Sequence, residues 1–179
     1  MRARSPRGSP RAPRPAGAEE GDARRAAPTV SPKALAVRYL ARRDYSRAEL
    51  ATRLLRQGVA EDVLERTLDE LAAAGYLSDT RYAQAVVAHR TGRFGKRAIV
   101  YALKERGVAQ ADVDQAVAPL AERDELEDAF ALWQRRFGVA PADDREKARH
   151  ARFLQSRGYG LSTALAVLKR AARGDTGEE

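Results

Sequence analysis

The sequence predicts an all-α protein of three tandem three-helix repeats that form an elongated, curved array. Three observations lead to this prediction. Apolar residues recur at helical spacing between residues 32 and 173, no run of alternating β-branched residues interrupts them, and one pattern of Leu and Gly occurs three times. The apolar residues are mainly Ala, Leu and Val, while aromatic residues make up only 6% of the chain, which also favours helices.

The first 30 residues do not follow this pattern. They contain seven Arg, five Pro and three acidic residues, with almost no aliphatic side chains. Such a segment cannot bury enough apolar surface to fold, so we expect a disordered basic tail over residues 1–30 and a second, frayed segment over residues 174–179. The tail lacks the apolar core of a signal peptide, and its prolines argue against a transit peptide.

A Leu stands four residues before a Gly at three places in the body of the chain. The pairs are Leu54 and Gly58, Leu103 and Gly107, and Leu154 and Gly158. The glycines are 49 and 51 residues apart, and apolar residues recur six and ten positions after each of them. We therefore expect each Gly to end a helix in the left-handed conformation, followed by a turn and another helix with one apolar face.

One more helix precedes each of these segments, so that each repeat has three helices. We expect these first helices over residues 34–43, 79–90 and 126–137, in repeats that span residues 31–78, 79–121 and 122–173. Short helices cannot bury their apolar stripes alone, so the repeats must stack against one another. The predicted first joint comprises Leu71, Tyr76, Leu77 and Tyr82, and the second lies around residues 119–124.

The aromatic residues are expected to have mainly structural roles. Phe130, Trp133 and Phe137 recur at helical spacing in the first helix of the third repeat, which indicates a core stripe. Phe94 lies between two glycines and beside Arg93 and Lys96, a setting in which an exposed ring could stack on a base. Packing between repeats is the more common role of such a ring, and we expect it here.

Several classes of protein are excluded. The chain has no Cys, which excludes disulfides and thiolate sites and indicates a reducing compartment, so we expect a cytoplasmic protein. Its longest uninterrupted apolar stretch has six residues, whereas a membrane span needs roughly 18 or more. His89 and His150 have no neighbours at metal-ligand spacing, and no catalytic motif occurs. We expect neither an enzyme nor a bound cofactor or metal.

Basic residues are concentrated in two blocks without acidic residues. The chain carries 33 basic and 25 acidic residues, a net charge of +8. Residues 80–104 contain six basic residues and residues 147–174 contain seven, whereas residues 105–128 contain eight acidic residues. A basic surface attracts an anionic partner, so we expect partner contacts from both blocks, with the acidic stretch facing away. The candidates are Arg90, Arg93, Lys96, Arg97, Lys104, Arg149, Arg152, Arg157, Lys169, Arg170 and Arg173. Arg152 has an alternative role in supporting the neighbouring Phe153.

Four segments of the body have a familiar sequence and order. They are LARRDYSRAELATRLLRQG, AAAGYLSDTRYAQAVV, LKERGV and ARFLQSRGYG. Together they resemble the bacterial RecX family of recombination regulators. The resemblance implies three tandem three-helix repeats and a protein that binds the RecA filament. Such a protein would lie in the helical groove of the filament, slow ATP turnover and strand exchange, promote disassembly or block growth, and catalyse no reaction. The matching positions belong mostly to the core and turns, so they do not identify the contact residues.

Two other functions remain open. One repeat could act as a helix-turn-helix reader of duplex DNA, which would require sequence-specific binding to a defined half-site. Alternatively, the array could be a scaffold that binds only protein and has no affinity for single-stranded DNA. Because we find no dimerisation segment, we expect a monomer. Its expected partner is the RecA filament, with single-stranded DNA as a second candidate.

Overall fold

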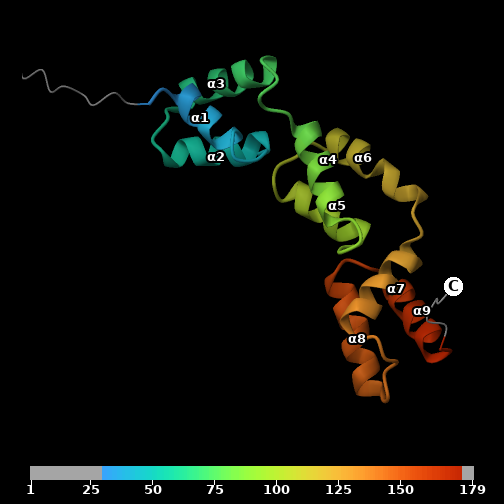
Figure 1. Ribbon diagram of the computed structural model, residues 1–179. Helices are drawn as coiled ribbons and strands as arrows, with labels where there is room; N and C mark the ends of the chain where they lie inside the picture. Colours follow the sequence, from blue (N-terminus) through green and yellow to red (C-terminus); the bar gives the residue numbers. More distant parts are fainter. Residues whose placement is uncertain (1–29, 175–179) are drawn as a thin grey trace, which may run out of the picture.

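The computed structural model describes residues 30–174, so the two segments predicted to be disordered lie almost entirely outside the described residues. In this part of the chain there are nine α-helices and one 3-10 helix, η1, and no strand (Figure 1). The elements are α1 (Pro32–Leu40), α2 (Arg47–Arg56), α3 (Glu61–Ala73), α4 (Asp79–Arg90), α5 (Lys96–Lys104), α6 (Gln110–Val117), η1 (Ala118–Glu122), α7 (Glu125–Arg136), α8 (Asp144–Ser156) and α9 (Leu161–Ala172). The all-α, three-repeat prediction is confirmed.

The three repeats follow one another in an elongated, curved array, as predicted (Figure 1). Within each repeat the second helix packs against the third. The second helices, α2, α5 and α8, lie on the inner side of the curve, and the third helices, α3, α6 and α9, lie on its outer side. The two sides of the array are therefore built from different helices.

Glycine ends the second helix of each repeat in the left-handed conformation. Gly58, Gly107 and Gly158 have φ angles of 82°, 70° and 91°, which confirms the prediction from the repeat pattern. The amide of the residue after each Gly donates a hydrogen bond of 3.2 Å to the carbonyl of the Leu four positions before that Gly. This bond satisfies a carbonyl that the end of the helix leaves free. Since the Leu side chain is also fully buried, the fixed spacing ties each turn to a core.

Each repeat has a hydrophobic core of its own. The first core contains Leu50, Leu54, Leu64 and Leu68, the second Ile99, Leu103 and Val113, and the third Phe130, Trp133, Leu154 and Leu168. The predicted aromatic stripe is confirmed, because Phe130 and Trp133 are buried and Phe137 packs against the same core. Phe94 lies half-buried at the edge of the second core.

The predicted first joint between repeats is confirmed only for Tyr82, which lines the cavity between the first and second repeats. Leu71 and Leu77 belong to the core of the first repeat, and Tyr82 belongs to the core of the second. Tyr76 is 54% exposed. The apolar pattern identified residues that close the two cores, whereas the joint itself is made by backbone, small side chains and the ion pairs Arg81–Asp44 and Arg106–Glu49, which carry no hydrophobic signal.

The actual first joint brings the start of α2 against the end of α5. Ser46 caps α2, and its hydroxyl also donates a hydrogen bond of 2.6 Å to the carbonyl of Arg106. A side chain at Gly107 would begin only 2.5 Å from Cβ of Ala48. Gly107 is therefore required twice, for its left-handed conformation and for the close approach of the first repeat.

The second joint repeats this construction one repeat further along the chain. The amide of Gly95, the residue before α5, donates a hydrogen bond of 2.9 Å to the carbonyl of Arg157. A side chain at Gly158 would begin 2.5 Å from Cβ and 2.7 Å from the amide nitrogen of Ala98. Residues 119–124, predicted to form this joint, contribute only its edge, where they line a cavity of about 210 Å³.

Candidate interaction surface

Charge differs systematically between the second and third helices of the repeats. The second helices α2, α5 and α8 carry three, three and four basic residues, against one, none and two acidic residues. The third helices α3 and α6 instead carry five and two acidic residues, against a single Arg. Only α9 departs from this rule, since it has Lys169 and Arg170 near its end and no acidic residue.

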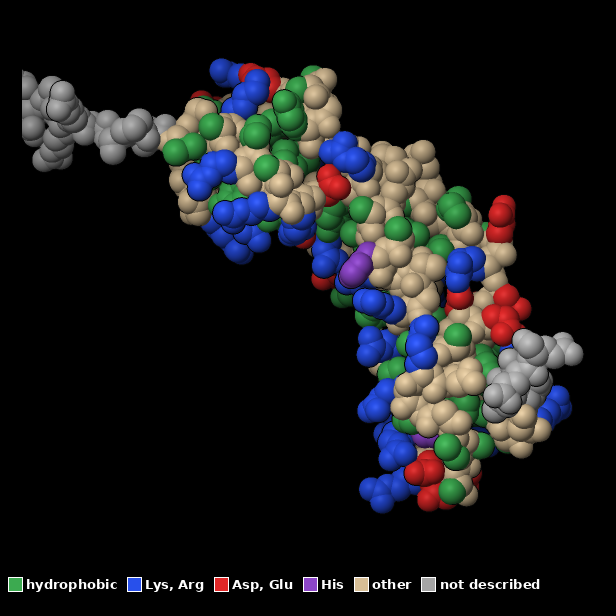
Figure 2. Space-filling model, in the orientation of Figure 1, with side chains coloured by type: hydrophobic (Ala, Val, Ile, Leu, Met, Phe, Trp, Pro, Cys, Tyr) green, Lys and Arg blue, Asp and Glu red, His purple; other side chains and the backbone are tan. Residues whose placement is uncertain are grey.

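This difference gives the array a basic inner side. In Figure 2, Lys and Arg side chains follow the inner edge of the curve from α2, past the second repeat, to α8. Acidic side chains gather on the opposite edge, beside α6 and η1. The acidic side chains on this edge agree with the prediction that the acidic stretch faces away. Glu105 and Glu125 of that stretch do not, because they line cavities beside the basic residues of α5.

Most candidates of the second repeat are exposed. Those that are exposed and form no ion pair among the described residues are Arg93, Lys96, Arg97 and Lys104. Arg97 and Lys104 are seven residues apart in α5 and therefore share one face of the helix. Arg90 differs from them, because it is half-buried and its guanidinium lies 5.0 Å from the ring centroid of Phe94.

The structure divides the C-terminal block between two helices. Arg149 and Arg152 are exposed on α8, where Arg149 pairs with Glu146 at 3.0 Å. Lys169, Arg170 and Arg173 lie on α9 or at its end, on the other side of the repeat. Residues that form one acid-free block in the sequence are thus not one surface.

Arg170 has a structural role. It pairs with Glu127 of α7, and its guanidinium lies 4.2 Å from the ring centroid of Phe130. A half-buried Arg that covers a core ring in this way stabilises the packing of α9 on α7 through its stem as well as its charge. It is the least suitable of the candidates for contact with a partner.

Arg157 stabilises the second joint. It is half-buried, and its guanidinium lies 5.1 Å from the ring centroid of Phe94 and 5.4 Å from that of Phe153. Phe94 therefore packs between the second and third repeats, as expected. Arg157 is also the residue that supports Phe153, whereas Nε of Arg152 donates a hydrogen bond of 3.1 Å to the carbonyl of Ala148.

The first repeat adds basic residues that the sequence analysis missed. The guanidinium of Arg43 lies 3.6 Å from the ring centroid of Tyr45, and that of Arg53 lies 5.1 Å from the same ring and 5.5 Å from that of Tyr39. Acidic residues interrupt this segment, among them Glu49, which pairs with Arg43 at 3.3 Å. The repeat pattern does not identify them either, because the equivalent positions in the other two repeats are Gly92 and Asp143 for Arg43, and Ala102 and Phe153 for Arg53.

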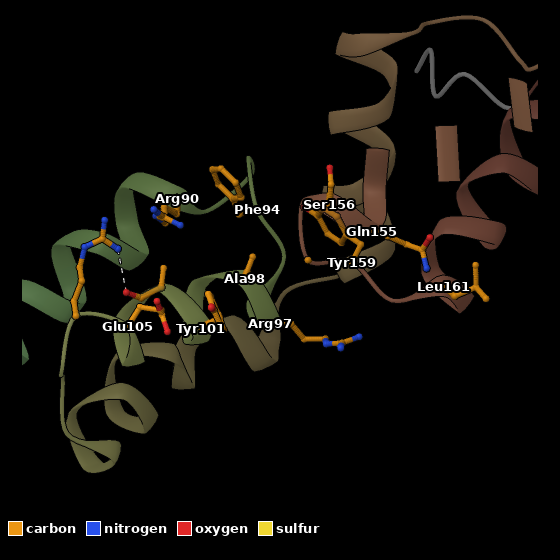
Figure 3. A pocket seen from close by; sticks show the side chains of 13 residues that line it. Arg90, Phe94, Arg97, Ala98, Tyr101, Glu105, Gln155, Ser156, Tyr159 and Leu161 are labelled. Atoms are coloured by element: carbon orange, nitrogen blue, oxygen red, sulfur yellow. Dashed lines mark hydrogen bonds between the residues drawn. The ribbon is translucent and has the colours of Figure 1, made fainter. Parts of the chain in front are cut away.

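Two cavities lie at the joints. One of about 350 Å³ is lined by residues of the first and second repeats, and one of about 680 Å³ by residues of the second and third. Arg90 and Arg106 line both cavities, so the two are neighbours, and their linings together include residues of all three repeats. Figure 3 shows the larger cavity, with Tyr101 of the second repeat on one side and Ser156 and Leu161 of the third on the other.

The buried ionisable groups of the third repeat serve its packing. His150 accepts a hydrogen bond of 3.3 Å from Nε1 of Trp133, and its ring stacks on Phe137 with 3.7 Å between centroids. Burial and the charge of Arg149 lower the pKa of His150, which favours the neutral form that can accept this bond. Burial also raises the pKa of Tyr159 to about 12.

These groups do not form a metal centre. Among residues 30–174, no cluster of three or more His, Cys, Asp or Glu side chains could hold a metal ion. In the same part of the chain no helix is long and apolar enough to cross a membrane.

The fold and the surface together define a class of helical-repeat protein whose basic inner groove is suited to contact a partner. Comparison with known families narrows the class. Family models described as the first, second and third three-helix domains of RecX match residues 33–71, 78–117 and 123–168. The chain belongs to the RecX family of regulatory proteins.

Individual relatives agree with this assignment. The chain is 43% identical over 144 residues to the regulatory protein RecX of Leptothrix cholodnii, which covers 80% of this chain and 91% of that protein. It is 39% identical over 154 residues to the regulatory protein RecX of Chromobacterium violaceum, with 86% and 99% covered. The crystal structure of RecX from Lactobacillus salivarius has the same fold, with a TM-score of 0.65 at 16% identity over 79% of this chain and 95% of that one.

Proposed function

We propose that this protein binds the filament that RecA forms on DNA and inhibits the ATPase, recombinase and strand-exchange activities of RecA. Membership of the RecX family supports a regulatory role, and the family resemblance implies RecA as the partner. On this proposal the protein acts as a cytoplasmic monomer, catalyses no reaction and needs no cofactor.

The observation that carries the proposal is the basic inner side of a curved array. A helical filament presents the same surface repeatedly along its groove, and the three repeats offer a basic second helix at each step. Contacts that are weak individually then act together, and such linked contacts can raise affinity by roughly 10² to 10⁴. The backbone contacts at Gly107 and Gly158 hold the repeats in the alignment that this requires.

A helix-turn-helix reader of duplex DNA is less compatible with the charge of the third helices. In that class of protein, the recognition helix that follows the turn enters the major groove. The corresponding α3 carries five acidic residues, and α6 carries two with no basic residue. Phosphate groups would repel these carboxylates, so the first two repeats are poorly suited to this function.

The test is ATP hydrolysis by RecA on single-stranded DNA, titrated with the protein. The full chain, the chain without residues 1–30, and the double variant Arg97→Ala/Lys104→Ala are compared. The matched control is Arg38→Ala/Arg66→Ala, which removes the same charge from two exposed positions on α1 and α3 that are not contact candidates. We expect the full chain to inhibit, and the α5 variant to need about tenfold more protein, since two screened contacts of about 0.7 kcal/mol each are lost.

The outcomes test the proposed function and the proposed contact surface separately. Absence of inhibition by the full chain would refute the proposed function. Equal shifts for the α5 variant and the control variant would show that the inner side is not the contact surface. Binding of single-stranded DNA without RecA, measured in parallel, would distinguish direct DNA contact from contact with RecA protein.

A further inference from the structure

The groove at the second joint has features beyond a general basic surface. We infer that it binds an acidic peptide segment of a protein partner, with one large apolar side chain of that segment held against Tyr101. The inference rests on the proposed function for the source of the segment, since the RecA filament is the expected partner. The site itself, however, is built entirely from residues of this chain.

Exposed apolar side chains from two repeats meet at this groove. Tyr101 on α5 is 65% exposed, and Leu161, the first residue of α9, is 54% exposed. Both line the cavity of about 680 Å³ that lies between the second and third repeats (Figure 3). A second cavity of about 580 Å³ shares Arg97 and Tyr101 with it. Both volumes lie in the range of about 300–1,000 Å³ that is common for ligand sites.

The apolar residues would gain from being covered. Among the described residues Tyr101 is the most exposed aromatic side chain, although its neighbours Ile99, Ala102 and Leu103 are buried. Water over such a ring is unfavourable by about 25 cal/mol for each Å² of apolar surface, so a partner side chain that covers Tyr101 and Leu161 would be stabilised.

Cationic side chains surround this apolar floor. Arg97, Tyr101 and Lys104 stand at i, i+4 and i+7 of α5 and therefore lie on one face, with the ring between the two charges. Arg97 extends from α5 toward the third repeat (Figure 3). The acidic residues in the lining are Glu105 and Glu125, which are outnumbered by Arg90, Lys96, Arg97 and Lys104. Arg106 also lines the cavity but pairs with Glu49 at 3.3 Å.

The start of α9 adds to the positive potential. Gly160 has no side chain to cap this helix, and the first-turn residues Ser162 and Thr163 line the cavity beside Lys96 and Lys104. The amides of an uncapped first turn favour a negative group. Carboxylates on either side of an apolar anchor would therefore meet positive charge on both the α5 and the α9 side.

An acidic peptide fits these features better than a nucleic acid. Single-stranded nucleic acids are bound by several aromatic rings that stack on successive bases. This groove offers one exposed ring, and its other exposed apolar side chain is aliphatic. Glu105 and Glu125 would also repel a continuous phosphate backbone, whereas a peptide can place its charges selectively.

The experiment uses the full chain and a fluorescein-labelled peptide of eight residues, with one central phenylalanine and aspartate or glutamate elsewhere. Fluorescence anisotropy measures its binding to the wild type, to Tyr101→Ser and to Arg97→Ala/Lys104→Ala. The control is Tyr76→Ser, which removes a tyrosine of similar exposure, 54%, outside the groove. Circular dichroism shows whether the variants are folded, which we expect because both tyrosines are exposed.

We expect Tyr101→Ser, and alanine in place of the peptide phenylalanine, each to weaken binding about tenfold, as loss of one apolar contact implies. Tyr76→Ser should have less than about a twofold effect, and added salt should weaken wild-type binding. No binding of the peptide, tighter binding of an eight-nucleotide oligo-dT, or equal effects at positions 76 and 101 would overturn the inference. RecA inhibition without peptide binding would overturn the inference alone, whereas peptide binding without RecA inhibition would overturn only the proposed function.

Discussion

Alanine in place of Gly158 should open the second joint, whereas alanine in place of Gly58 should leave the array intact. The two glycines have φ angles of 91° and 82°, so alanine costs roughly 1–2 kcal/mol in the left-handed conformation at either position. The added methyl group at position 58 meets no atom within 4 Å. At position 158 it would lie 2.5 Å from Cβ of Ala98, well inside the roughly 3.5 Å at which two carbons touch.

Gly158→Ala should cost more stability than Gly58→Ala because it also disrupts contacts of the second joint. The new methyl group would also lie 2.7 Å from the amide nitrogen of Ala98, and backbone cannot move aside as a side chain does. Relief requires the repeats to separate by about 1 Å. This weakens the hydrogen bond from Gly95 to Arg157, worth about 1 kcal/mol, and the contact of Arg157 with Phe94, worth about 0.5–1 kcal/mol. We therefore expect Gly158→Ala to lower the free energy of unfolding by about 3 kcal/mol and Gly58→Ala by about 1 kcal/mol.

Urea unfolding followed by far-UV circular dichroism measures both values. RecA inhibition, measured where both variants are fully folded, should fall for Gly158→Ala and stay near wild type for Gly58→Ala. Equal losses of stability at the two positions would refute the reasoning, because they would show that the left-handed conformation alone determines the cost.

Two further predictions concern stability. Ser46→Ala removes both the cap of α2 and the hydrogen bond to the carbonyl of Arg106, so it should cost about 2 kcal/mol, whereas Ser31→Ala removes only the cap of α1 and should cost about 1 kcal/mol. Thermal unfolding compares them, and a loss for Ser46→Ala no larger than that for Ser31→Ala would contradict the role of Ser46 at the joint. Because the pKa of His150 is lowered in the folded protein, the unfolded chain binds the proton more tightly, and stability should fall as the pH drops below about 6.5. Urea unfolding monitored by the single Trp should therefore show a smaller difference between pH 7.5 and pH 5.5 for His150→Gln than for the wild type; an unchanged difference would exclude His150 as the cause.

The ends of the second helices could be predicted because their signals are local. Gly58, Gly107 and Gly158 follow buried leucines at a fixed distance, and the same few residues form both the turn and its hydrogen bonds. The aromatic stripe of α7 was equally predictable, since one helix face in a repeat of this size has only its own core to pack against.

The joints could not be predicted, because they depend on residues that are inconspicuous in the sequence. Ala48 and Ala98 are small side chains near the starts of two helices, and their role arises only from the distant glycines that they contact. Tyr76, in contrast, was wrongly predicted to belong to the joint. It is apolar and lies between two repeats in the sequence, yet it is exposed.

The candidate surface was predicted only in part, because sequence proximity shows which residues share a helix but not how different helices are arranged. Arg97 and Lys104 share one face of one helix, so adjacency in the sequence is a sufficient guide to them. In the third repeat a turn separates Arg152 from Lys169, and the acid-free block is divided between α8 and α9. The partner of Arg170, Glu127, is 43 residues away, so its ion pair was not visible in the sequence.

The residue before each of the three helix-ending glycines shows how the joints place the basic helices on one side of the array. Arg106 and Arg157 stand at the two joints, where their carbonyls accept hydrogen bonds from the preceding repeat. Gln57 stands at the free end, where the adjacent Gly58 contacts no other repeat. Each joint thus places the end of one second helix against the start of the second helix before it, which keeps all three on one side of the array. Because these helices carry ten basic residues against three acidic ones, opening a joint should weaken binding of an anionic partner even where each repeat remains folded.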